Sequence, residues 1–167
     1  MTANRHVYYM AHPLRPTQEE IDATEPYRVE PGRNEYELDS EIWIPYEERV
    51  KEATLANAER AMRWLAWLRR SFPLVTFIAP WIASVLAGDD DRDPVMRAAG
   101  IADAVTLIPR LDGVVMVGGR VSEGMRCEGD VARQVVSLTH LGAEPPREVP
   151  ADTADVMRQL ARGERAL

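Results

Sequence analysis

The stretch that decides the fold is Asp112-Gly113-Val114-Val115-Met116-Val117-Gly118-Gly119. Its apolar run is rich in valine, which is typical of a strand buried on both faces of a parallel sheet. The two glycines after the run let the chain turn tightly, and Ser122 then stands where a helix N-cap is expected. A strand, a glycine turn and a capped helix in this order predict one βα unit of a parallel sheet.

Two other short apolar runs predict strands of the same kind. Residues 7–11 are stopped by Pro13, and residues 74–79 lie between two prolines. Helices are predicted at about residues 50–71, 81–86, 94–107, 122–140 and 151–167. Strands that alternate with helices predict the α/β class: a Rossmann-like open parallel sheet flanked by helices, in a single domain of residues 1–167.

The longest predicted helix has a clear apolar period. Leu55, Ala58, Met62 and Leu65 follow one another at i, i+3, i+7 and i+10. This spacing puts the four side chains on one face of a helix, so the pattern indicates a helix over these residues.

The negative charge of the chain is confined to one segment. Residues 16–50 contain eleven acidic residues and three arginines, a net charge of −8, against −7 for the whole chain. They also contain four prolines, which argue against a regular element. We interpret this segment as an acidic insertion or lid after the first strand, in which Trp43 and Tyr46 either stack on a ligand or pack against the rest of the domain.

Composition excludes several classes of protein. An acidic chain without a basic stripe is unsuited to binding nucleic acid polymers, whose phosphates supply most of the affinity. No run of 18 apolar residues is present, so we expect no membrane span, and the first 13 residues lack the apolar core of a signal peptide. A single cysteine, Cys127, fits a cytoplasmic location, and the three histidines share no metal-ligand spacing. We therefore predict no metal and no cofactor.

The candidate site is expected where the strands end, because ligands bind beyond the carboxyl ends of the strands in open parallel sheets. The glycine turn leads into a helix start whose free N–H groups favour an anion, and Ser122 adds a hydroxyl. Glu128 follows within about 9 Å of Ser122 along the helix axis, where a carboxylate could attack the anomeric carbon of a sugar. Plain βα architecture with a solvated Glu128 is the alternative that the residues alone leave open.

Three stretches carry motifs of a known family. They are Tyr9-Met10-Ala11-His12-Pro13-Leu14-Arg15, Asn57-Ala58-Glu59-Arg60-Ala61, and residues 112–120 followed by Ser122-x-Gly124-x-x-x-Glu128. In this order they resemble the opening strand Tyr-x-Ala-Gly-Pro-x-Arg, the helix start Asn-x-x-Arg-Ala and the signature "Asp, apolar strand, Ser-x-Gly-x-x-x-Glu" of the nucleoside 2-deoxyribosyltransferase superfamily, and especially an uncharacterised bacterial and phage branch of it. The third motif is the most specific, and the resemblance covers most of the chain outside the acidic segment.

The resemblance implies N-glycosidic chemistry. It implies that Glu128 is a nucleophile that forms a covalent glycosyl intermediate, and that Tyr9 hydrogen-bonds and tunes its carboxylate. Ser122 stands where the transferases carry Asp. Ser122 and Arg15 match positions that contact phosphate in the relatives that hydrolyse deoxynucleoside 5'-monophosphates. The resemblance also implies a homodimer or a higher homo-oligomer.

Four further residues complete the predicted substrate-binding set: His12, Asp112, Gly119 and Gly124. His12 stands where the family has glycine, so its ring either crowds the ligand or donates a hydrogen bond to a phosphate or a base. Asp112 either touches the base or forms a turn with the glycine that follows it.

We therefore predict cleavage or transfer of the N-glycosidic bond of a small-molecule nucleoside or nucleoside 5'-monophosphate through a glycosyl-Glu128 intermediate. A non-catalytic nucleotide-binding or sensing module on the same scaffold is the first alternative. An interaction protein that works through its acidic segment is the second.

Overall fold

The computed structural model describes residues 5–30, 40–88 and 93–162, and the chain divides into two compact units. Met1–Pro13 and Ala58–Leu167 form the larger unit, and Leu14–Asn57 forms the smaller one. Residues 31–39 of the predicted insertion and residues 163–167 of the predicted last helix lie outside the described residues.

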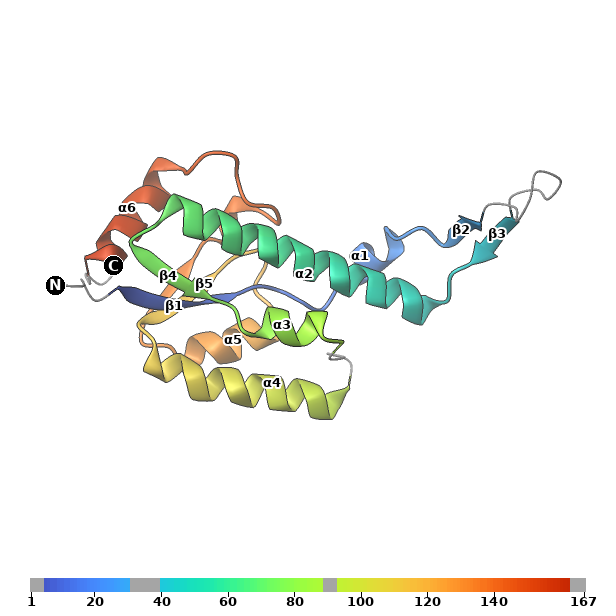
Figure 1. The fold of residues 1–167 in the computed structure, drawn as a ribbon, viewed down its shortest axis with the longest axis horizontal. Coiled ribbons are helices and arrows are strands. Elements are labelled where there is room, and N and C mark those ends of the chain that lie inside the picture. The colour runs from blue at the N-terminus through green and yellow to red at the C-terminus, as the bar shows by residue number, and fades with distance from the viewer. Residues whose placement is uncertain (1–4, 31–39, 89–92, 163–167) are drawn as a thin grey trace. The chain divides into compact units, whose positions relative to one another are not determined.

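The larger unit is built around a parallel sheet, which has four strands in the described part of the chain (Figure 1). The order β4-β1-β5-β6 places β1 and β5 in the centre, and Tyr9 of β1 pairs with Ile78 of β4 and Val114 of β5. The strands are β1 (His6–Ala11), β4 (Val75–Ile78), β5 (Gly113–Met116) and β6 (Val135–Ser137). The predicted α/β class with a Rossmann-like parallel sheet is confirmed, and so are the three predicted strands.

Helices cover both faces of this sheet (Figure 1). Because side chains alternate along a strand, Tyr8 and Met10 pack on one face with residues of α2 and α6, whereas Tyr9 and Ala11 pack on the other with residues of α4 and α5. The helices of this unit are α2 (Tyr46–Ser71, which begins in the smaller unit), α3 (Trp81–Leu86), α4 (Pro94–Leu107), α5 (Glu123–Asp130) and α6 (Ala151–Ala161). The predicted helices at 81–86 and 94–107 are confirmed.

Helix α2 is longer than predicted, and its apolar period is buried only in part. Leu55 and Met62 are 39% and 37% exposed, whereas Ala58 is fully buried. The buried side continues through Ala61 and Trp64. Ala61 and Trp64 belong to the core on this face of the sheet, and Leu65 packs against it.

The prediction of one helix from residue 122 to about 140 is also wrong. Helix α5 ends at Asp130, and the chain then forms β6 beside β5. At Gly129 the helix lies so close to the sheet that an added Cβ would come within 2.7 Å of the Met116 Cε atom. The β-branched pair Val135 and Val136 favours a strand, and Val136 is 4% exposed in the core.

The smaller unit contains regular elements that the sequence did not predict. Helix α1 (Gln18–Asp22) begins with a capping box, in which the Thr17 hydroxyl accepts from the Glu20 amide at 3.2 Å and the Glu20 carboxylate accepts from the Thr17 amide at 2.7 Å. Strands β2 (Tyr27–Glu30) and β3 (Ser40–Trp43) form an antiparallel pair. The prediction of an irregular segment is therefore wrong for these residues.

Aromatic side chains of the smaller unit contact one another and an arginine. Tyr27 and Trp43 meet edge to face, with their ring centres 5.4 Å apart. The Arg49 guanidinium lies 6.0 Å from the ring centre of Trp43 and 5.9 Å from that of Tyr46. Trp43 and Tyr46 nevertheless remain about half exposed. Their stacking on a ligand stays a prediction.

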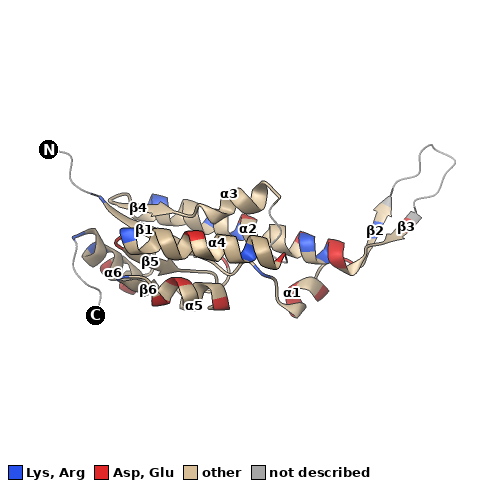
Figure 2. Ribbon diagram, turned by 90° about the horizontal axis from the view of Figure 1, so that it is seen from below, with Lys and Arg blue, Asp and Glu red and all other residues tan. Residues whose placement is uncertain are grey.

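Charged residues of both signs are spread along the helices (Figure 2). The excess of negative charge comes from the sequence of residues 16–50. Among the residues that the structure describes, no helix is long and apolar enough to cross a membrane.

Candidate functional site

The carboxyl ends of β1 and β5 lie side by side, and each continues into a segment with predicted site residues. His12 follows β1, and Gly118 and Gly119 follow β5. A Cβ added at Gly118 would come within 2.6 Å of the His12 ring, and Gly118 has a φ of +94°. Gly119 has a φ of +78°, and a Cβ there would come within 2.9 Å of the Ala143 nitrogen. Both positions therefore require glycine, both for backbone conformation and for space.

Helix α5 begins directly after this glycine turn. The Ser122 hydroxyl accepts a hydrogen bond from the Met125 amide at 3.3 Å, so Ser122 is the N-cap that the sequence predicted. The space beside Gly124 is open, since the nearest atom to an added Cβ would be the Ser122 Oγ at 3.9 Å. The first turn of α5 thus stands at the edge of the sheet where a ligand is expected.

Tyr9 and Glu128 form the chemically distinctive pair of this region. Tyr9 is only 2% exposed in the core between the sheet and helices α4 and α5, and its side chain is hydrogen-bonded to that of Glu128. Burial raises the pKa of Glu128 to about 7, and the hydrogen bond from Tyr9 opposes this rise. Burial, together with the charge of Glu128, raises the pKa of Tyr9 well above its ordinary value. Tyr9 is therefore the neutral donor and Glu128 the acceptor.

This geometry places Glu128 in a setting that suits chemistry. The carboxyl group is partly withdrawn from water, has a buried phenol beside it, and ionises near neutral pH. A carboxylate with these properties can act as a nucleophile or exchange a proton, depending on pH. The solvated glutamate that the residues alone left open is not what the structure contains.

His12 is packed into the protein. The residue is 6% exposed, and both ring nitrogens are buried. Its ring stacks on that of Trp81, with the ring centres 6.4 Å apart and the planes inclined by 22°. The Trp81 indole N–H donates to the Met10 carbonyl at 3.1 Å, which fixes the indole against β1. In this conformation His12 supports the Gly118 turn, and its predicted contact with a substrate requires the ring to move.

Asp112 lies at the amino end of β5, whereas Gly119 and Ser122 follow the carboxyl end of that strand. It comes just before β5, and its carboxylate accepts from the Val7 amide at 2.7 Å and lies 3.2 Å from the His6 ring. Burial would raise the pKa of Asp112, but the hydrogen bonds from Val7 and His6 outweigh it and lower that pKa. Strand β5 and the residues that flank it separate Asp112 from Gly118 by about 20 Å. The structure therefore does not bring Asp112 together with Ser122 and Glu128, and the residue links the starts of β1 and β5.

Arg15 belongs to the smaller unit, near the point where Leu14 accepts a hydrogen bond from the Asn57 side chain at 3.0 Å. Its contact with a phosphate stays a prediction.

An apolar groove of about 360 Å³ lies between α2 and α3, apart from this pair. Met62, Leu65 and Leu86 are among its lining residues. Arg69 is the charged residue of the lining, and its guanidinium donates to the Phe77 carbonyl at 3.0 Å. No carboxylate or imidazole is among the described residues that line this groove.

One contact near the glycine turn was missed by the sequence analysis. Glu144 forms ion pairs with Arg60 and Arg63 of α2, and the preceding residue, Ala143, packs against Gly119. The spacing of the two arginines on one helix face is visible in the sequence. Their partner is not, because it lies more than 80 residues away.

No family model matches this chain, and neither a curated protein nor a solved structure was found to be similar to it. The fold and the site define the chain as an α/β protein with a Rossmann-like sheet and a buried Tyr–Glu pair near the carboxyl edge of that sheet.

Proposed function

We propose that this protein cleaves or transfers the N-glycosidic bond of a nucleoside or a nucleoside 5'-monophosphate, with Glu128 as the nucleophile. The observation that carries the proposal is the hydrogen-bonded pair of Tyr9 and Glu128, whose carboxyl pKa is raised to about 7 by burial. Such a group is ionised in part at neutral pH and is poorly solvated, which favours attack on an electrophilic carbon.

The reaction would run in two steps. The ionised Glu128 carboxylate attacks C1' of the sugar, the bond from C1' to the base nitrogen breaks, and its electron pair leaves with the base, which takes up a proton. Water or a second base then attacks C1' of the glycosyl ester and releases the carboxylate, and the attacking group loses a proton. Tyr9 holds the carboxylate in place and stabilises its charge by donating a hydrogen bond.

The glycine turn and the start of α5 support a phosphorylated substrate. Backbone N–H groups at a helix start favour an anion, and the Ser122 hydroxyl lies among them. Chemistry on free nucleotides would also place the protein in the cytoplasm. Assembly into a homo-oligomer belongs to the same proposal.

The test is release of free base from a panel of nucleosides and nucleoside 5'-monophosphates, followed by chromatography. We expect release by the unmodified protein and a loss of at least about a thousandfold in Glu128→Ala, because the covalent path is removed. Asp130→Asn is the matched control, since this carboxylate lies on the same helix but is exposed. It should retain activity.

Two results would contradict the proposal. Undiminished release by Glu128→Ala would exclude Glu128 as the nucleophile. An intact panel, together with a higher melting temperature in the presence of a nucleotide, would favour the non-catalytic binding module.

A further inference from the structure

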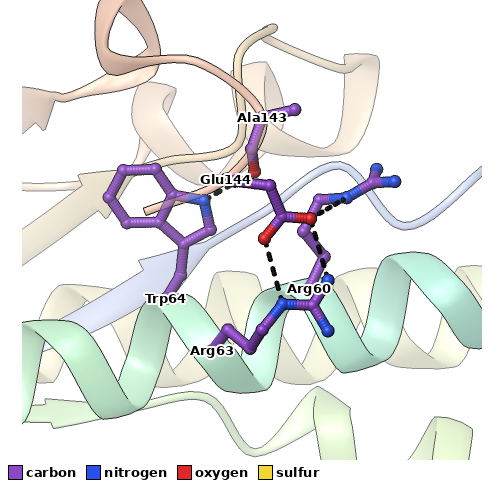
Figure 3. Close-up of polar contacts among 5 residues, drawn as sticks. All are labelled: Arg60, Arg63, Trp64, Ala143 and Glu144. Carbon is purple, nitrogen blue, oxygen red and sulfur yellow. Dashed lines mark hydrogen bonds and ion pairs between the residues drawn. The ribbon is translucent and has the colours of Figure 1, made fainter. Parts of the chain in front are cut away.

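Two arginines of α2 converge on one carboxylate in the larger unit (Figure 3). The Glu144 carboxylate accepts from the Arg60 Nε at 3.1 Å and from the Arg63 Nε and Nη2 at 3.0 and 2.8 Å. Arg63 therefore binds the carboxylate with two parallel hydrogen bonds, and Arg60 adds a third. Forks of this kind match the oxygen spacing of carboxylates and of phosphates.

The cluster of Arg60, Arg63 and Glu144 is open to solvent, so an anion from solution can take the place of the Glu144 carboxylate. The side chains of Arg63 and Glu144 are 50% and 54% exposed, and that of Arg60 is 22% exposed. An exposed ion pair contributes only about 0–1 kcal/mol. A phosphate dianion brings more charge and more acceptor oxygens to the same two guanidinium groups than a single carboxylate does.

The cluster lies next to the carboxyl edge of the sheet. The indole N–H of Trp64, on the same helix, donates to the Ala143 carbonyl at 2.8 Å and fixes the loop that carries Glu144 (Figure 3). The nitrogen of Ala143 is the atom that a Cβ at Gly119 would approach to 2.9 Å. Glu144 therefore directly follows the residue whose backbone abuts the glycine turn.

We propose that Arg60 and Arg63 form a binding site for phosphate groups, and that Glu144 competes with the phosphate for the two guanidinium groups. The site requires no glycosidic chemistry, so it goes beyond the proposed function. Its phosphate can come from a nucleotide bound at the neighbouring sheet edge or from a free phosphate compound. The chemistry that recognises it is the same in both cases.

Calorimetric titration with inorganic phosphate tests this proposal. We expect Glu144→Gln to bind phosphate at least about tenfold more tightly than the unmodified protein, because the competing charge is gone while the side-chain shape is kept. Arg63→Gln and the double variant Arg60→Gln/Arg63→Gln should lose the binding. Asp155→Asn is the matched control, since it removes the carboxylate that pairs with Arg158 on α6 and leaves the cluster intact. It should bind like the unmodified protein.

Titrations with a nucleoside 5'-monophosphate and with the matching nucleoside identify the source of the phosphate. Tighter binding of the nucleotide than of inorganic phosphate would assign the site to the nucleotide, and equal binding would assign it to free phosphate compounds. Both titrations are repeated with Glu128→Ala to separate this proposal from the proposed function. Phosphate binding should survive in that variant, whether or not the unmodified protein releases a base.

The proposal is overturned if Glu144→Gln binds phosphate no more tightly than Asp155→Asn does. It is also overturned if Arg63→Gln, measured on folded protein with an unchanged circular dichroism spectrum, binds as tightly as the unmodified chain. Arg63 is half exposed, so its single substitution tests the site even if the double variant fails to fold.

Discussion

Glu128 and Glu144 lie in the same unit, and their surroundings shift their pKa values in opposite directions. Burial raises the pKa of Glu128 to about 7, and its hydrogen-bond partner is the neutral hydroxyl of Tyr9. The hydrogen bond from Arg63 lowers the pKa of Glu144, which lies on the surface between two cations. Ionising Glu128 therefore costs stability because its carboxylate is desolvated, whereas the ionised Glu144 is stabilised by its two arginine partners.

The largest effect expected from this contrast is a gain in stability in Glu128→Gln at alkaline pH. The raised pKa means that the folded protein binds a proton that the unfolded chain has already released between about pH 4.5 and 7. The contribution of Glu128 to stability is therefore present below pH 4.5 and is lost as pH rises through 7. At pH 8 the variant should be more stable by up to about 3 kcal/mol.

Denaturant unfolding at pH 5 and pH 8 measures this gain. The difference between Glu128→Gln and the unmodified protein should be small at pH 5 and large at pH 8. Asp130→Asn, an exposed neighbour on α5, should show no such dependence. A Glu128→Gln variant that is equally or less stable at pH 8 would show that the carboxylate is well solvated.

The next effect concerns the hydrogen bond within the Tyr9–Glu128 pair. Tyr9→Phe removes the donor that opposes the rise of the Glu128 pKa, so that pKa should increase further, by up to about one unit. If the ionised carboxylate is the nucleophile, base release should then reach half of its maximum at a correspondingly higher pH.

Tyr8→Phe is the control for this pH profile. Its hydroxyl donates to the Gln134 side chain at 3.1 Å, and its ring packs in the core on the other face of the sheet. It should leave the midpoint of the profile unchanged. A Tyr9→Phe profile that coincides with the unmodified one would show that the phenol does not tune the carboxylate.

The sequence predicted the central elements well where one short segment carries all the information. The valine-rich run before Gly118 predicts a buried strand whatever surrounds it, and the Ser122 cap depends on atoms only three residues away. The pairing of Tyr9 with Glu128 was an implication of the family motifs. Its physical consequence, a pKa near 7, depends on burial by helices and strands that no local pattern contains.

The predictions that failed, or were not made, share a cause: contacts between residues far apart in the chain decided the structure, and a local pattern does not contain them. The helix expected beyond Asp130 gives way to β6, because Val136 is buried there beside β5. Glu144 meets Arg60 across 84 residues of chain, a contact that no spacing rule predicts.

The smallest expected effect is on the stability of Glu144→Gln. The lowered pKa means that the contribution of this carboxylate is present above its ordinary pKa and is lost as pH falls through the lowered value. Because the group is about half exposed, its loss at pH 7 and low salt should cost less than about 1 kcal/mol. Screening by 0.5 M sodium chloride should remove most of that difference. Unfolding at both salt concentrations measures it, with Asp155→Asn as the surface control. A cost of several kcal/mol that salt does not change would contradict this prediction. Glu144 would then hold the loop at Gly119 in place, and its carboxylate would not be exchangeable for another anion.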